Sequence, residues 1–503
     1  MGALLAVDHG TTRTKALLLD EDLRIRAQAA VHLRQQYPHS GWVEQDPLEI
    51  VDVTRRAIST CLAQAHLRPH DLSGFGLANQ GETVVVWDRA TGIPVRPAIV
   101  WQDRRTTEMC AALVARGCEP EVRQRTGLRL DPYFSATKLR WILDDIEAGQ
   151  ARAERGDLLA GTTDTWLLWK LSGGVIHVTD VSTASRTLLM NIHTLEWDPW
   201  LLDLFRIPRA LLPAVLPSIG PGVDLALDER ELTRRVPVLA LAVDQQAALF
   251  GHGCHRPGMA KVTYGTGAFA LMHVGTTAVP SQHGLLTTVA WGRAGRAEYA
   301  LDGGVFVAGA AVQWLAEGLA LLPSVQASME LASSVPDSGG VVVVPSLAGL
   351  AAPHWDPRAR GAVFGLTLAS TRAHLVRATL EGVAHQVDDV MDSMAKDAGV
   401  RLELIRVDGG PSQNDALMQI QADTLGIPVE VATMEEATAF GVGAMAGVAR
   451  GWWEPAAVEA AWRPRTRFVP RISEADRRTK RRVWAEAVEH VRAWAPPLAE
   501  IRR

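Results

Sequence analysis

Two turns in the sequence pair glycine with threonine in a way that suits phosphate binding. Segment 8–12, Asp-His-Gly-Thr-Thr, lies between apolar segments that predict strands at 3–7 and 16–19. Segment 265–267, Gly-Thr-Gly, lies between apolar segments in the same way, about half a chain length later. Such a turn leaves backbone N–H groups and hydroxyls facing outward, where they bind anions such as phosphate. The repeat predicts two similar halves that face a shared cleft.

Two more predicted strands end in polar residues. Segment 404–407 is followed by Asp-Gly-Gly-Pro-Ser-Gln-Asn at 408–414, and segment 238–243 is followed directly by Asp244 and a helical pattern. In open α/β sheets, ligands bind at the carboxyl ends of the strands. Asp244 has two interpretations on this evidence: it is a helix N-cap, or it is a carboxylate held at the mouth of the cleft.

The elements that must position these residues follow from the spacing of apolar residues. Residues 25–31 predict a third strand near the start of the chain. The predicted helices cover residues 47–65, 373–395, 416–425 and 473–494. The apolar stretch 303–325 contains Gln313 and Glu317, so we expect a buried helix there and not a bilayer span.

The composition restricts the class of protein. A length of 503 residues predicts about two to three domains, and a net charge of −5 argues against a general nucleic-acid binder. The four cysteines form no Cys-x-x-Cys pair, which argues against a zinc ribbon or a disulfide scaffold and fits a reducing compartment. The sequence carries no export signal. We therefore expect a globular cytoplasmic protein without a membrane span.

Longer motifs carry a resemblance to a known family. Residues 133–141, Tyr-Phe-Ser-Ala-Thr-Lys-Leu-Arg-Trp, fit the first signature of the FGGY carbohydrate kinases, and residues 361–366 together with 374–381 fit the second. Further matching stretches are 41–47, 100–106, 164–167 and 349–357. The chain therefore resembles this family from residue 3 to residue 450.

The resemblance implies an α/β fold with two ribonuclease-H-like domains, of the actin and hexokinase type, flanking a central cleft. Residues 1–250 would bind the polyol and the phosphates and carry the catalytic aspartate. Residues 251–503 would bind the adenine nucleotide and end in a helical tail. The implied partners are ATP, a small polyol and further copies of this chain in a dimer or tetramer, and no nucleic acid.

The resemblance also implies ATP and Mg²⁺, because phosphoryl transfer needs a phosphate cradle, a metal and a group that orients the attacking hydroxyl. By their match to the family motifs, the nucleotide-binding residues are Thr11, Thr12, Arg13, Lys15, Gly265, Thr266, Gly309, Gln313, Gly410 and Asn414. Asp8 would hold Mg²⁺ through water, and Asp244 would accept the proton of the substrate hydroxyl. The polyol-binding residues are Glu82, Trp101, Tyr133, Asp244, Gln245 and Phe269, although Trp101 and Phe269 could instead be ordinary core.

One residue departs from the family pattern. The motif Asn-Gln-Arg-Glu-Thr has Gly81 in place of its arginine, so a guanidinium that would donate to two hydroxyls is missing. Three explanations are open: glycerol binds weakly, a larger polyol fills the vacated space, or a nearby arginine such as Arg104 substitutes. The expected reaction is phosphorylation of glycerol to sn-glycerol 3-phosphate. The alternatives are a kinase for a larger polyol or ketose and, more remotely, a non-catalytic nucleotide-binding regulator.

Overall fold

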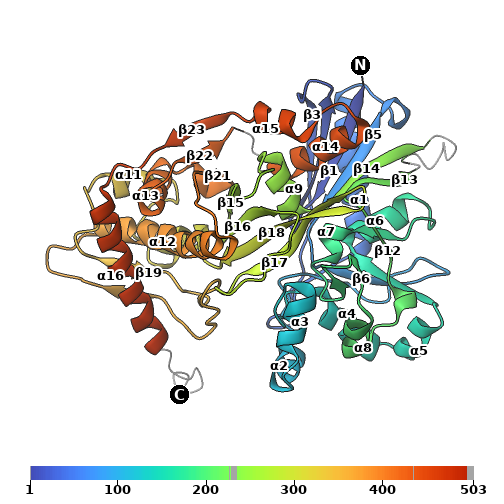
Figure 1. Ribbon diagram of the computed structural model, residues 1–503, viewed down its shortest axis with the longest axis horizontal. Helices are drawn as coiled ribbons and strands as arrows, with labels where there is room; N and C mark the ends of the chain where they lie inside the picture. The colour runs from blue at the N-terminus through green and yellow to red at the C-terminus, as the bar shows by residue number, and fades with distance from the viewer. Residues whose placement is uncertain (1, 226, 228–234, 434–435, 495–503) are drawn as a thin grey trace.

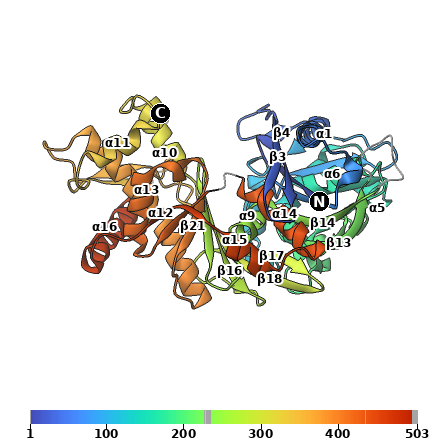
Figure 2. The ribbon, with the colours of Figure 1, turned by 90° about the horizontal axis from the view of Figure 1, so that it is seen from above.

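The computed structural model describes residues 2–225, 227, 235–433 and 436–494. Two lobes lie side by side (Figures 1 and 2): one contains the described part of residues 2–251, and the other contains most of the C-terminal half, whereas the helix over Ala437–Arg450 lies in the N-terminal lobe. Within the described residues, 13 strands form one mixed sheet that runs through both halves. In sheet order these strands are β23 (Pro464–Phe468), β22 (Val429–Ala432), β21 (Ile405–Asp408), β15 (Ala260–Tyr264), β16 (Ala268–Gly275), β18 (Arg296–Val305), β17 (Leu286–Arg293), β13 (Ile219–Leu225), β14 (Val236–Val243), β5 (Gly74–Asn79), β1 (Ala3–His9), β2 (Arg13–Asp20) and β3 (Ile25–His32).

Each half repeats one strand pattern. In the N-terminal half, β1, β2 and β3 form an antiparallel meander and β1, β5 and β14 are parallel, which gives the order β3-β2-β1-β5-β14. In the C-terminal half the order is β18-β16-β15-β21-β22, antiparallel among the first three strands and parallel among the last three. The predicted pair of ribonuclease-H-like α/β units is therefore confirmed.

Helices cover both faces of the N-terminal part of the sheet. Helix α1 (Pro47–Gln64) packs on β2 and β3, and α14 (Ala437–Arg450) packs on β1, β5 and β14. Successive side chains of a strand alternate between the two faces, so Leu5 and Val7 join the core under α1, whereas Leu4 joins the core under α14. A strand covered on both faces is a continuous apolar run, which explains why β1 can be predicted from sequence.

The predicted helices form with small changes at their ends. Asp46 caps α1 by accepting the N–H of Leu48 at 2.8 Å. The other three are α12 (Arg372–Ala398), α13 (Asp415–Leu425) and α16 (Glu474–Ala493). The charged helix α16 buries Trp484, Val488 and Val491 against the C-terminal half and presents its other face to solvent.

A close helix crossing joins the two halves. Helix α9 (Asp244–Gly251) follows β14 directly and packs against α14, although α14 belongs to the C-terminal part of the sequence. A β carbon added to Gly441 would lie 1.8 Å from the carbonyl oxygen of Ala247. Glycine at position 441 therefore allows the two helix backbones to touch at this crossing.

A smaller sheet and several short helices extend the N-terminal half. Its strands, in sheet order, are β4 (Glu44–Gln45), β7 (Ala98–Ile99), β6 (Val84–Asp88) and β8 (Leu158–Thr162), and the helices beside it include α4 (Ser135–Asp145) and α7 (Val181–Ala184). The loops at the ends of these elements carry Glu82, Trp101, Tyr133 and Arg186. This region therefore positions four side chains beside the end of β14.

The prediction of one buried helix over residues 303–325 is wrong. The stretch begins in β18, continues as α10 (Gly309–Gln313) and a π-helical turn over Trp314–Gly318, and then becomes irregular. A β carbon on Gly303 would lie 2.6 Å from Val390, so glycine lets this strand pack closely on α12. None of the helices in the described residues combines the length and apolar character that a membrane crossing requires.

Candidate active site

The carboxyl ends of β1, β5 and β14 bring two aspartates together. In the register of the sheet, Asn79 at the end of β5 is opposite both His9 and Val243. Asp8 therefore lies at the same sheet edge as Asp244, the first residue of α9. The charge on Asp244 contributes to a raised pKa of Asp8. The sheet thus places the predicted base beside the predicted metal-binding residue.

Asp244 is a partly exposed carboxylate in an electrostatically unusual place. Burial and the neighbouring charge of Glu82 raise the pKa of Asp244 to about 7. The Gln245 N–H, which donates to Asp244 Oδ1 at 2.7 Å, works against this rise, as do the charges of Lys261 and Arg186. Because Val243 is the N-cap of α9, the interpretation of Asp244 as an N-cap is wrong. A carboxylate with a pKa near neutrality is suited to general-base work.

Asp8 has the properties expected of a carboxylate that is suited to binding a cation. Burial raises the pKa of Asp8 to about 7 despite the opposing charge of Lys15. Its Oδ1 is buried and forms no hydrogen bond with any described residue. No group of three or more His, Cys, Asp or Glu side chains in the described residues could hold a metal, but Mg²⁺ uses few protein carboxylates and completes its shell with water and substrate phosphates. Asp8 therefore fits Mg²⁺.

The first threonine turn lies next to the predicted polyol residues. The N–H of Gly10 donates to the carbonyl of Arg13 at 3.0 Å and closes the turn, which leaves Thr12 exposed. The hydroxyl of Thr11 accepts the indole N–H of Trp101 at 2.9 Å. Lys15, also expected to bind the nucleotide, forms a 2.5 Å ion pair with Glu436 on the segment before α14.

The three glycine-containing segments predicted to bind the nucleotide converge in the C-terminal half. The N–H of Gly309 donates to the carbonyl of Gly265 at 3.0 Å, and a β carbon on Gly309 would lie 3.0 Å from Pro411. A β carbon on Gly410 would meet nothing within 4 Å, so this segment borders open space. Thr266 in the second threonine turn is exposed as well.

Two predicted nucleotide residues have local structural partners. The side-chain amide of Gln313 donates to Glu317 one turn later in the chain, at 3.1 and 3.2 Å. Asn414 caps α13 by accepting the N–H of Leu417, and it donates to the Ser328 hydroxyl at 3.0 Å. Their proposed contacts with a nucleotide stay predictions.

Three aromatic rings come together from different parts of the chain. The Trp101 ring meets the Tyr133 ring edge to face at 5.5 Å, and it meets the Phe269 ring at 6.4 Å. Phe269 lies on β16, so the C-terminal half supplies one of the three rings. Trp101 and Phe269 are only partly buried, which contradicts the interpretation of these two as ordinary core. Their edges and faces suit the carbon backbone of a small polyol.

One explanation for Gly81 does not hold. A β carbon at position 81 would lie 2.8 Å from Cγ2 of Val243, so a side chain at this position would have to displace Val243. The Arg104 side chain is half exposed and forms a 2.9 Å ion pair with Asp131. Arg104 therefore does not stand in for the missing guanidinium.

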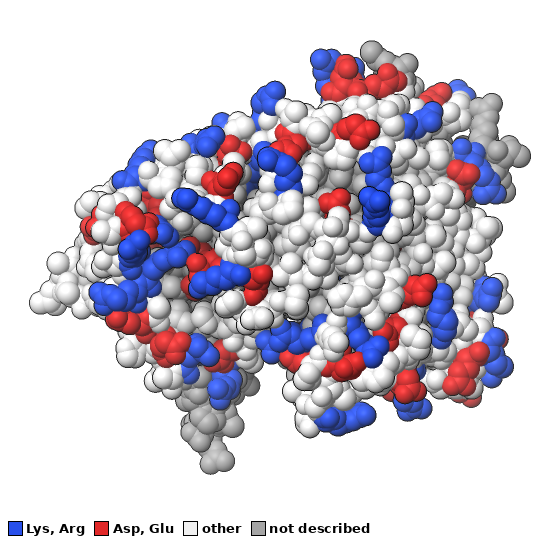
Figure 3. Space-filling model, in the orientation of Figure 1, with Lys and Arg blue, Asp and Glu red and all other residues white. Residues whose placement is uncertain are grey.

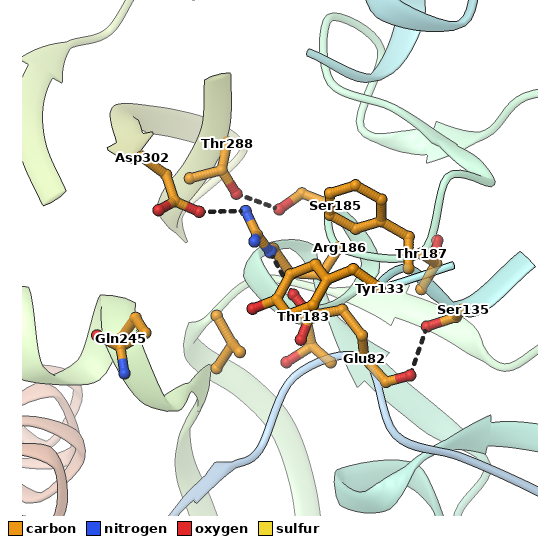
Figure 4. A network of polar contacts seen from close by, with 12 residues as sticks. Glu82, Tyr133, Ser135, Thr183, Ser185, Arg186, Thr187, Gln245, Thr288 and Asp302 are labelled. Carbon is orange, nitrogen blue, oxygen red and sulfur yellow. Dashed lines mark hydrogen bonds and ion pairs between the residues drawn. The ribbon is translucent and has the colours of Figure 1, made fainter. Parts of the chain in front are cut away.

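Three charged residues that motif matching missed surround the predicted polyol residues. Arg186 contacts Glu82 and Asp302 (Figure 4), and Lys261 donates to the side-chain oxygen of Gln245. Arg186, Asp302 and Lys261 are each the single charged residue of a long segment. These segments are 181–190, 299–316 and 257–272, respectively. Because an isolated charge in a buried segment must find a partner, this pattern is the signal that could have revealed them.

Comparison with known proteins places the chain and its fold among carbohydrate kinases. The models of the FGGY family of carbohydrate kinases match residues 3–251 (N-terminal domain) and 260–450 (C-terminal domain). A glycerol kinase of Halorhodospira halophila is 50% identical over 491 residues, which cover 98% of this chain and 97% of the relative. The crystal structure of Plasmodium falciparum glycerol kinase with ADP has a TM-score of 0.91 at 31% identity and covers 98% of each chain. A ligand-bound xylulose kinase from Lactobacillus acidophilus, 20% identical, shares the fold with a TM-score of 0.88 over 100% of both chains.

Proposed function

Because the chain belongs to the FGGY family of carbohydrate kinases, phosphotransferases with an alcohol acceptor, we propose that it transfers the γ-phosphoryl group of ATP to glycerol and forms sn-glycerol 3-phosphate. The observation that carries the proposal is the position of Asp244, whose carboxylate has a pKa near 7 and lies at the sheet edge shared with Asp8. The similarity to glycerol kinases over nearly the full chain supports glycerol as the acceptor.

In this proposal the polyol lies between Asp244 and the aromatic rings. Asp244 accepts the proton of the primary hydroxyl as its oxygen attacks the γ-phosphorus, a contribution typically worth about 10²- to 10⁴-fold in rate. Trp101, Tyr133 and Phe269 contact the carbon chain, while Glu82 and Gln245 bind the remaining hydroxyls. Holding the hydroxyl in line with the phosphorus supplies a further part of the rate.

The two halves divide the substrates between them. Residues 1–250 bind the polyol and, through the turn at Thr11 and Thr12, the phosphates; residues 251–503 bind the adenine nucleotide through the converging glycine segments. Bound Mg²⁺ would neutralise phosphate charge and polarise the transferred group. Asp8 would hold that ion through water, which is consistent with its unpartnered, buried oxygen in the described structure.

The setting of the enzyme is part of the same proposal. All four cysteines lie in the described residues and are free thiols, which supports a reducing cytoplasm. On the face shown in Figure 3, positive and negative side chains are interspersed around a broad area of uncharged residues. Together with the net charge of −5, this supports small-molecule partners over nucleic acid. The chain is expected to form a dimer or tetramer, and light scattering after gel filtration would measure its mass.

A substrate screen tests the proposed reaction. Purified protein with ATP and Mg²⁺ is assayed for ADP release with polyols and ketoses of three to six carbons. Glycerol should give the highest kcat/KM, and phosphorus NMR should identify sn-glycerol 3-phosphate. Turnover of a pentitol or ketose in place of glycerol would refute the acceptor and keep the kinase. No turnover with any acceptor, together with tight ATP binding, would favour the nucleotide-binding regulator.

A further inference from the structure

Arg186 lies at the centre of a charged network that joins the two halves. Its Nε donates to Oε1 of Glu82 at 2.8 Å, and its Nη1 lies 2.9 Å from Oδ2 of Asp302. Glu82 follows β5 in the N-terminal half, whereas Asp302 lies on β18 in the C-terminal half. Figure 4 shows the guanidinium between these two carboxylates. Since Arg186 is only 4% exposed, water and salt screen these contacts weakly.

The surroundings of Arg186 are those of the predicted polyol residues. The Tyr133 ring lies 5.8 Å from its guanidinium carbon. Burial alone would lower the pKa of Arg186, but the charges of Asp302 and Glu82 hold it above its ordinary value. Within the described residues, Nη1 of Arg186 is buried and forms no hydrogen bond, although it lies 2.9 Å from Oδ2 of Asp302. The guanidinium therefore keeps donor capacity beside Tyr133 for a hydroxyl of a substrate.

The neighbourhood of Gly81 excludes a second arginine. A β carbon at position 81 would lie 2.8 Å from Val243 Cγ2 and 3.8 Å from Cγ of Arg186. Valine is branched at Cβ and has little freedom to rotate away. A side chain at position 81 would therefore have to displace Val243, which precedes Asp244 directly.

We propose that Arg186 provides the guanidinium of the polyol site in place of the arginine absent at position 81, and that its ion pair with Asp302 ties that site to the C-terminal half. Arg186 fixes one oxygen of Glu82 and donates to a substrate hydroxyl, so Glu82 and Arg186 form the Arg-Glu pair that the sequence motif lacks. This inference rests on the proposed function for the identity of the polyol.

The test is a comparison of two Michaelis constants. Arg186→Met should raise the KM for glycerol about 10- to 100-fold, because it removes a charged donor. The KM for ATP should change less than about twofold, since Arg186 contacts neither threonine turn. Arg186→Lys keeps the charge but loses the planar guanidinium. Its KM for glycerol should therefore lie between the values of the wild type and Arg186→Met. The matched control Arg104→Met should behave like the wild type.

A rescue experiment separates binding from a structural role. In the Arg186→Met background, the pair Gly81→Arg and Val243→Gly should recover at least tenfold of the lost affinity for glycerol. Gly81→Arg alone should give no recovery, because Val243 still occupies the space. Calorimetric titration with glycerol measures these affinities without turnover.

Several results would overturn the role of Arg186. An unchanged KM for glycerol in Arg186→Met, or equal increases in both Michaelis constants, would contradict it, as would failure of the double substitution to rescue. If Arg186→Met does not fold, Arg186→Lys and Asp302→Asn take its place. The test is then whether each variant raises the KM for glycerol more than the KM for ATP. If the wild type phosphorylates another polyol, the proposal of glycerol as the acceptor is wrong. The KM for that polyol and the KM for ATP, compared between the wild type and Arg186→Met, then still test the role of Arg186.

Discussion

Asp244 is the residue whose ionisation should control the rate. Burial beside Glu82 raises the pKa of Asp244 to about 7, and a protonated carboxyl cannot accept a proton. We therefore expect kcat/KM for glycerol to fall about tenfold per pH unit below pH 7, because this parameter reports ionisation in the free enzyme. Asp244→Asn should lower kcat about 10²- to 10⁴-fold. A full-activity Asn variant, or a flat profile between pH 5 and about 7 in the wild type, would contradict the assignment.

Ionisation of Asp244, which should raise the rate, should lower the stability of the folded protein. The pKa of Asp244 is about 7 in the folded protein against an ordinary value of 3.8, so the unfolded chain loses this proton first as the pH rises. Ionised Asp244 therefore costs stability, and the cost grows between these two values. Asp244→Asn removes that cost, so its Tm should exceed the wild-type Tm at pH 8 and approach it near pH 4. Scanning calorimetry at both pH values measures the difference, and Ala247→Gly in the same helix is a control without this pH dependence.

The roles of single residues could be predicted where a sequence motif identifies the residue. They could not be predicted where the role depends on an ion-pair partner that is distant in the sequence. Asp8 and Asp244 end apolar strands, and the topology of an α/β sheet then places them together. The isolation of Arg186 in an uncharged segment indicates that it needs a partner, but it does not indicate that the partner is Glu82, 104 residues away in the sequence. Its role depends on what surrounds Gly81, and only packing reveals that Val243 fills this space.

At the scale of elements, the crossing of α9 and α14 should depend on Gly441. By intrinsic helix propensity alone, alanine at position 441 would stabilise the helix by about 1 kcal/mol relative to glycine. Its β carbon, however, would lie 1.8 Å from the carbonyl oxygen of Ala247. Forcing such helices apart typically costs about 1–3 kcal/mol or more, so Gly441→Ala should lower the urea midpoint. It should also reduce kcat, since α9 carries Asp244. Thr438→Ala, a partly exposed site in the same helix, should leave the midpoint nearly unchanged, and equal midpoints in the two variants would refute this account.

Elements could be predicted where one pattern dominates. The strands β1 and β14 are short apolar runs bounded by turn residues, and α1 begins with an N-cap and proline. Residues 303–325 mislead because glycine, alanine and valine are compatible with either state. Only the pairing of β18 with β16 and β17, and its packing on α12, show that this segment starts as a strand.

At the scale of the whole molecule, the ion pair between Lys15 and Glu436 connects the two halves of the sequence beside the turn predicted to bind the phosphates. Glu436 holds Lys15 at 2.5 Å and also raises the pKa of Asp8. Glu436→Gln should free Lys15 for ATP, so the KM for ATP should fall roughly 1.5- to 5-fold, the range expected for a partly exposed ion pair. Asp22→Asn, which breaks the exposed pair with Arg24, is the control. A higher KM for ATP in Glu436→Gln would mean that Glu436 itself assists nucleotide binding.

The matching strand order gives the molecule an internal pseudo-symmetry, and this symmetry is broken at one chemically decisive position. Superposing β1 on β15 pairs Gly10 with Gly265 and Thr11 with Thr266, but it pairs Asp8 with Thr263. The first copy thus carries a carboxylate where the second carries a hydroxyl, and that hydroxyl accepts a hydrogen bond from the ammonium of Lys261 at 2.9 Å. Exchanging the two turns would therefore remove the carboxylate from the side that holds Asp244.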